Sequence, residues 1–114
     1  MLHHPPYSCA VGRKSEGKDL VQHIVPLLEA YGVDLVLVGH DHVYGRSANL
    51  NGVHYVISGG GGSKLYNSKE DAQMIKCRKV FHYVRFTVEN DALRWTAVGD
   101  DGAIIDTYAL TKEE

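Results

Sequence analysis

The sequence predicts a mixed α/β fold (α+β) that begins with a β-α-β unit and continues with antiparallel strands. Three observations lead to this prediction. Residues 33–38 (VDLVLV) form a short, nearly continuous apolar run, which after a helix is typical of a buried parallel strand. Residues 18–31 place apolar side chains at helical spacing. Residues 80–110 alternate between apolar and polar positions and are divided by turn residues, as in an antiparallel meander.

The first elements follow one another closely in a chain of 114 residues, a length that allows one domain at most. Residues 1–8 are expected to be the end of a strand, which Pro5 and Pro6 stop because proline has no N–H for further pairing. A polar loop then leads to the helix. Pro26 should kink that helix or divide it in two, and Gly32 suits its C-terminal cap.

The second half of the chain is expected to consist of strands joined by loops. Residues 40–52 should form a loop, and the polar residues 64–79 a long loop or a short helix. The expected strands cover residues 54–58, 80–89, 93–97 and 104–110.

Composition excludes some partners and leaves the compartment open. The net charge of −2 gives no basic footprint for nucleic acid. No apolar run approaches the roughly 20 residues that span a membrane. The two cysteines, Cys9 and Cys77, fit no close-spaced metal pattern and either pair or stay free.

Histidine is frequent, with seven residues, and four of them fall at the ends of two expected strands. His40 and His42 follow the buried strand directly, and in an extended segment both would face one side. A right-handed crossover would bring His3 or His4 to the same edge of the sheet. Three imidazoles would suffice for a catalytic zinc site, whereas a two-metal site also needs oxygen ligands. Asp41 should point away from its neighbours and is not assigned as a ligand.

Plainer interpretations remain for these features. An H-x-H pair in a soluble protein is more often a surface pair or a satisfied polar pair than a metal site. His23, His54 and His82 are expected to be structural. The glycine run at residues 59–62 lacks the spacing of a phosphate-binding loop. It fits a plain loop, with close approach of the backbone to a ligand as the alternative.

Two motifs together resemble a known family. The first is H-x-P, formed by His3-His4-Pro5 and followed by Tyr7 and Ser8. The second is G-H-x-H at residues 39–42, preceded by Val33-Asp34 and followed by Tyr44 and Arg46-Ser47. This combination resembles the calcineurin-like metallophosphoesterases, and most of all their purple acid phosphatase branch. The resemblance covers about residues 1–63.

The resemblance implies a β-sandwich flanked by helices, with two metal ions (Fe, Zn or Mn) that activate a water against a phosphate ester. Residue by residue, it makes His3 and His40 ligands of the second metal and His42 a ligand of the first. His4 falls at the variable position of the motif and is not a ligand in this reading. Tyr44 and Arg46 would shape the substrate pocket.

The family's other blocks, D-x-H, G-D-x-x-[DY] and G-N-H-[DE], precede H-x-P and do not occur in this sequence. Residues 1–114 are therefore expected to be the C-terminal portion of a single metallophosphoesterase domain, with the N-terminal portion as its partner. The intact protein is expected to be an enzyme, and this chain alone is expected to be inactive, with no catalytic residue assigned. Relatives of this type are often exported, so an extracytoplasmic or secreted location is open.

Two alternatives belong to other functional classes. H-x-H after a strand also occurs in amidohydrolase-type barrels, but these need about 250 residues and no antiparallel meander. The other is a non-catalytic interaction module whose histidines are incidental or bind a single metal.

Overall fold

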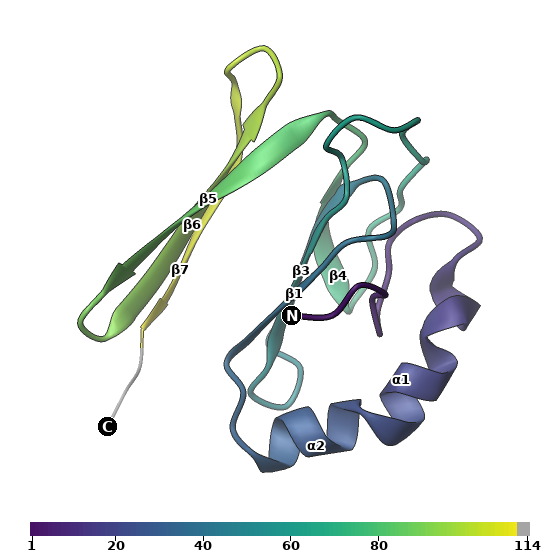
Figure 1. Ribbon diagram of the computed structural model, residues 1–114, viewed down its shortest axis with the longest axis vertical. Coiled ribbons are helices and arrows are strands. Elements are labelled where there is room, and N and C mark those ends of the chain that lie inside the picture. The colour runs from purple at the N-terminus through teal and green to yellow at the C-terminus, as the bar shows by residue number, and fades with distance from the viewer. Residues whose placement is uncertain (112–114) are drawn as a thin grey trace.

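A computed structural model describes residues 1–111 and arranges them as two sheets with helices on one side (Figure 1). The mixed α/β prediction is confirmed at this level. The first sheet has the order β1-β3-β2-β4 and the second the order β5-β6-β7. The strands are β1 (Leu35–Val38), β2 (Tyr44–Ser47), β3 (His54–Ser58), β4 (Met74–Arg78), β5 (His82–Glu89), β6 (Ala92–Gly99) and β7 (Ile104–Thr111).

The predicted helix is present in two pieces. A 3-10 turn, η1 (Lys14–Gly17), leads into α1 (Lys18–His23), and α2 (Val25–Ala30) follows with Pro26 in its first turn. Proline is tolerated there because the first N–H groups of a helix have no partner within it, so Pro26 divides the helix as predicted. Gly32 then ends α2 with a φ of 70°, which glycine adopts without strain. Within residues 1–111, no helix combines the length and apolar character needed to cross a bilayer.

The N-terminal segment and β1 run side by side. β1 pairs in parallel with β3, which confirms the buried parallel strand. On the other edge of β1, the backbone N–H of Leu2 donates to the carbonyl of Leu37 at 2.9 Å. The N–H of Gly39 donates to the carbonyl of His3 at 3.0 Å. The first strand of the expected β-α-β unit is therefore reduced to one parallel bridge, yet it still lies where the crossover placed it.

Two strands lie where loops were expected, so those two predictions are wrong. β2 falls within residues 40–52 and β4 within residues 64–79. The Tyr-Gly-Arg-Ser sequence of β2 has no apolar alternation and is held by antiparallel neighbours on both edges. The buried residues of β4, Met74 and Cys77, are three positions apart, and the ladder between β2 and β4 is irregular. A period of two is therefore absent from β4.

Each face of the first sheet borders one hydrophobic core. The first core lies between this sheet and the helices and includes Val25, Val36 and Ile57. The other core lies between the two sheets and centres on Trp95, which is 1% exposed. Alternate residues of β1 and β3 contribute to the two cores, because neighbouring side chains of a strand point to opposite faces.

A disulfide joins Cys9 to Cys77 across a sequence separation of 68 residues. Backbone bonds reinforce the link, since Val11 N–H donates to the carbonyl of Asn67 and Lys69 N–H donates to the carbonyl of Cys9, both at 2.9 Å. The loop between Pro6 and η1 is thus joined to the segment that leads into β4. The sequence had left the pairing of the two cysteines open.

Candidate metal centre

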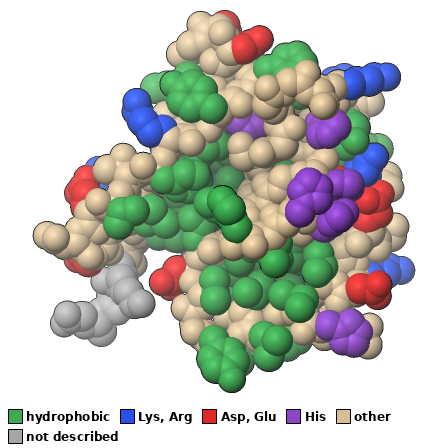
Figure 2. All heavy atoms as spheres, in the orientation of Figure 1, with side chains coloured by type: hydrophobic (Ala, Val, Ile, Leu, Met, Phe, Trp, Pro, Cys, Tyr) green, Lys and Arg blue, Asp and Glu red, His purple; other side chains and the backbone are tan. Residues whose placement is uncertain are grey.

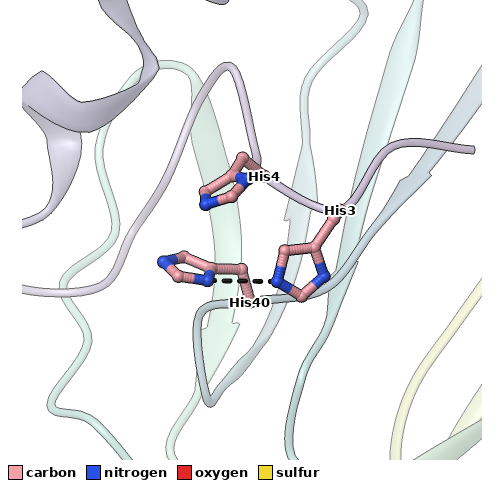
Figure 3. A group of neighbouring side chains, drawn as sticks. All are labelled: His3, His4 and His40. Atoms are coloured by element: carbon pink, nitrogen blue, oxygen red, sulfur yellow. Dashed lines mark hydrogen bonds between the residues drawn. The ribbon is translucent and has the colours of Figure 1, made fainter.

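Three histidine side chains meet at the end of β1. His3 is brought there by its backbone bond with Gly39, and His40 follows Gly39 directly. Nδ1 of His40 lies 3.2 Å from Nε2 of His3. His4 joins them, so that one ring nitrogen from each of the three lies within 4.8 Å of the others (Figure 3). His3 and His4 are exposed, and Figure 2 shows histidine side chains gathered on the surface beside acidic ones.

The segment that carries His40 and His42 is not extended, which corrects the expectation that both would face one side. The N–H of Asp41 donates to the carbonyl of Gly39 at 2.7 Å, and the N–H of Val43 donates to the carbonyl of Asp41 at 2.8 Å. Bonds between residues two apart define tight three-residue turns. His40 lies at the centre of the first turn with a φ of 65°. The extended geometry that would place both histidines on one side is therefore absent here.

His42 makes its own contacts away from the three-histidine group. Its Nδ1 lies 2.7 Å from the carbonyl oxygen of Lys64, and its ring stacks on Tyr66 with a centroid distance of 4.3 Å. Arg13 also contacts this tyrosine, since its guanidinium carbon lies 4.2 Å from the centre of the Tyr66 ring. Lys64 and Tyr66 thus hold His42 in place, although no sequence pattern links this segment to it.

Asp41 points into the interior, as its place between the two histidines suggested. It is 1% exposed, and its Oδ2 accepts a short hydrogen bond from the hydroxyl of Ser8. Its Oδ1 is buried and has no hydrogen-bond partner among the described residues. The nearest positive charge is Nη1 of Arg13, at 3.8 Å.

Arg13 and Glu16 border the histidine group and were missed in the sequence. Nη1 of Arg13 lies 3.4 Å from Nε2 of His40 and 3.4 Å from Oε1 of Glu16. Oε1 of Glu16 in turn lies 3.6 Å from Nε2 of His40. Glu16, His40 and Asp41 form a second group that is close enough to hold a cation. The guanidinium of Arg13 contacts all three and supplies the positive charge there. In the sequence the two residues belong to an ordinary polar loop.

Tyr44 and Arg46 lie between the two sheets, and the structure does not bring them to the histidine group. The hydroxyl of Tyr44 donates to Oδ2 of Asp106 at 2.6 Å, and Nε of Arg46 donates to the same oxygen at 2.8 Å. Trp95 donates to the Tyr44 oxygen at 3.2 Å. Burial and the contact with Asp106 raise the pKa of Tyr44, so the phenol stays protonated. Substrate binding by these two residues stays a prediction, and their contacts favour a structural role.

The glycine run that follows β3 packs against protein backbone. A Cβ on Gly59 would lie 2.0 Å from the carbonyl oxygen of Asp41, and one on Gly60 would lie 2.6 Å from the carbonyl oxygen of Val80. No side chain fits at either position without displacing backbone. The backbone of Gly59 therefore lies close to the turn that carries the histidines, and not to a ligand. Gly61 and Gly62 face open space.

His82 is buried and is expected to make stability depend on pH. Its Nδ1 lies 2.9 Å from the carbonyl of Val80 and its Nε2 lies 3.0 Å from the hydroxyl of Ser58. In the neutral ring Nδ1 donates and Nε2 accepts from Ser58. Burial lowers the pKa of His82 below 6.5 and outweighs the opposing hydrogen bond to Val80. The unfolded chain therefore takes up a proton at a higher pH than the folded chain, and stability falls as the pH drops below about 6.5.

We expect the free energy of unfolding, measured by urea titration, to fall between pH 7.5 and pH 5, by up to about 1.4 kcal/mol per pH unit for each such histidine. Burial, and after it the charge of Arg46, also lowers the pKa of His54, so His54 adds to the effect. His82→Gln should reduce the pH dependence, whereas His23→Gln, an exposed histidine at the end of α1, should leave it as in the wild type. An unchanged slope in His82→Gln would contradict the assignment.

The donor set at this edge of the sheet fits one metal ion of intermediate softness. Three imidazoles do not select among zinc, iron and manganese. They do disfavour calcium and magnesium, which prefer oxygen ligands. Of the nearby carboxylates, Asp41 is engaged by Ser8 and Glu16 by Arg13. A second ion beside His42 would need oxygen ligands that the described residues do not place there.

No protein-family model matches the chain, but curated proteins do. Tartrate-resistant acid phosphatase type 5 of Rattus norvegicus is 44% identical over 59 residues, which cover 52% of this chain and 17% of that protein. Purple acid phosphatase 18 of Arabidopsis thaliana is 35% identical over 69 residues, 54% of this chain and 16% of that protein. The Homo sapiens type 5 enzyme is 35% identical over 81 residues, 71% of this chain and 24% of that protein. The chain thus spans less than a quarter of the length of each.

A solved structure matches almost the whole chain. It is that of GAP50, the anchor in the inner membrane complex of Plasmodium, with a TM-score of 0.86 over 98% of this chain and 35% of that chain. The sequence identity is 21%, so this likeness concerns the fold.

Proposed function

We propose, from the confirmed resemblance of this chain to the purple acid phosphatases, that its residues form the C-terminal portion of a metal-dependent phosphoesterase. The substrate would be a phosphate ester. The observation that carries the proposal is the 3.2 Å approach of a His3 nitrogen to a His40 nitrogen at the end of β1. The two facing sheets with helices on one side are what such a portion would contribute to a helix-flanked sandwich.

The proposed roles follow the two places where histidines lie. His3 and His40 would hold one ion, and His42, which lies apart from them, would hold the other. Two bound ions (Fe, Zn or Mn) would supply an activated water for attack on phosphorus and cleavage of the ester P–O bond. Glu16 and Arg13 would orient the His40 ring, and Tyr66 the His42 ring. The remaining oxygen ligands would come from polypeptide outside these residues.

Metal binding by the 114-residue chain tests the proposal. We expect it to bind zinc or manganese, and we expect His3→Ala and His40→Ala each to weaken binding at least about tenfold, because loss of a ligand costs no less than loss of a supporting group. His23→Ala serves as the matched control, since His23 is exposed and lies on α1. Circular dichroism confirms that each variant is folded.

Hydrolysis of an aryl phosphate by the same samples provides the second measurement. The chain alone is expected to show none, because the second ion lacks its oxygen ligands. Metal binding that is indifferent to both His3→Ala and His40→Ala would overturn the phosphoesterase proposal. Turnover by the chain with stoichiometric metal would instead overturn its reading as a portion of a larger enzyme.

A further inference from the structure

We propose that His4 is a third ligand, beside His3 and His40, of one metal ion that this chain binds without help from other polypeptide. The inference rests on the proposed function for His3 and His40 and adds the residue that the family pattern leaves variable. The ion is a divalent transition metal, with zinc as the probe. Three imidazoles and an open fourth position are the donor set of a catalytic zinc site.

The separation of the first two ligands already suits a tetrahedral ion. Zinc–nitrogen bonds of 2.0–2.1 Å at the tetrahedral angle place two ligand nitrogens about 3.3 Å apart. Nδ1 of His40 and Nε2 of His3 lie 3.2 Å apart. This spacing is set by backbone pairing, because His3 and Gly39 are bonded neighbours of two parallel segments. The two nitrogens therefore span one edge of a zinc tetrahedron before any ion binds.

His4 lies over this edge. Its ring centroid is 4.1 Å from that of His40 and 4.8 Å from that of His3. Figure 3 shows the three rings around a shared space, with His4 on the side opposite the backbone of His40. A ring nitrogen of His4 lies within 4.8 Å of those of His3 and His40. Because the His4 side chain is exposed, it can rotate to bring this nitrogen to bonding distance of the shared ion.

The backbone of His4 is held even though its side chain is free. Pro5 and Pro6 follow it and are both buried. A proline restricts the residue before it to extended conformations, which narrows the choices of His4. Gly17 packs so closely against this point that a Cβ there would lie 2.2 Å from the carbonyl oxygen of Pro6. The Cα of His4 is thus fixed between the bridge to β1 and the anchored prolines.

A carboxylate lies near the ring nitrogen of His40 that faces away from the proposed ion. With a metal on Nδ1, the proton of the ring resides on Nε2, and such N–H groups usually face a carboxylate. Oε1 of Glu16 lies 3.6 Å from Nε2, while Nη1 of Arg13, which also contacts Glu16, lies 3.4 Å from the same nitrogen, so Glu16 would accept from Nε2–H only after the guanidinium moves aside. His42 is not among the three histidines whose ring nitrogens lie within 4.8 Å of one another, so it is not assigned to this ion.

Calorimetric titration of the chain with zinc tests the inference. One ion per chain should bind, and His4→Ala should weaken its affinity at least about tenfold, as should His3→Ala and His40→Ala. His23→Ala, at an exposed position of α1, should leave that affinity within twofold of the wild type. Cobalt gives an independent readout, since its visible absorption strengthens in tetrahedral coordination. We expect that absorption in the wild type and its loss in His4→Ala.

The outcomes separate this inference from the proposed function. If His4→Ala binds zinc as His23→Ala does while His3→Ala and His40→Ala are weakened, His4 is not a ligand and the proposed function is unaffected. If none of the three substitutions matters, both fail. Because His4 is exposed, its replacement should not unfold the chain, and circular dichroism of the variant verifies this.

Discussion

Replacing Asp106 by alanine is expected to lower the free energy of unfolding by about 3–5 kcal/mol, because the change strands a buried charge. Asp106 lies on β7 and is 8% exposed. It accepts hydrogen bonds from the Tyr44 hydroxyl at 2.6 Å and from Nε of Arg46 at 2.8 Å. The Arg46 side chain is 14% exposed and stacks over Tyr108, so water cannot readily replace the lost carboxylate. Tyr44 loses its acceptor as well.

The single tryptophan makes this loss measurable. Trp95 is buried between the sheets and donates to the Tyr44 hydroxyl oxygen, so its fluorescence reports on this region during urea unfolding. Asp100→Ala is the matched control, since Asp100 is exposed in the turn after β6, and it should change stability by about 0.5 kcal/mol or less. Asp106→Asn, which keeps an acceptor but no charge, should fall between the two. A loss below about 1 kcal/mol in Asp106→Ala would contradict the assigned role.

Reducing the Cys9–Cys77 disulfide is expected to cost about 4 kcal/mol of stability. The bond closes a loop with a sequence separation of 68 residues, and the entropy that a cross-link removes from the unfolded chain grows with the size of the loop. Oxidised and dithiothreitol-treated chains should therefore differ clearly in their urea midpoints. Both cysteines are buried, so the reduced wild type is a cleaner comparison than a serine variant, which would also bury hydroxyl groups.

The Cys9→Ala/Cys77→Ala double variant provides the control for this measurement. It should unfold near the midpoint of the reduced wild type and should not respond to dithiothreitol. Equal midpoints for the oxidised and reduced wild type would show that the backbone bonds around Val11 and Lys69 hold the loop without the cross-link.

Features that depend on neighbours in sequence could be predicted, and features that depend on distant partners could not. The apolar run of β1 and the division of the helix at Pro26 follow from local rules and were found. β2 was missed because its residues are held by partners far along the chain, such as Asp106 for Arg46, 60 positions away. β4 was missed because its buried residues do not alternate.

The candidate site divides in the same way. The strand ends predicted that His3 and His40 would meet, because parallel neighbours end at one edge of a sheet. The extended arrangement of His40 and His42 was wrong, since the tight turn at His40 has a positive φ that no local pattern announced. Arg13, Glu16 and Tyr66 are brought to the histidines by tertiary contacts between loops. A single sequence gives no signal for such contacts.

The covalent link between Cys9 and Cys77 also changes what a cut in the backbone can do. A single break at any peptide bond between these two residues leaves both pieces joined through sulfur. His40, His42 and the glycine run after β3 lie inside that loop, while His3 lies outside it. A nick between Cys9 and His40 would therefore leave the segments bearing His3 and His40 in one molecule, whereas a nick in the turn between β6 and β7 would leave β7 without a covalent tie to the rest.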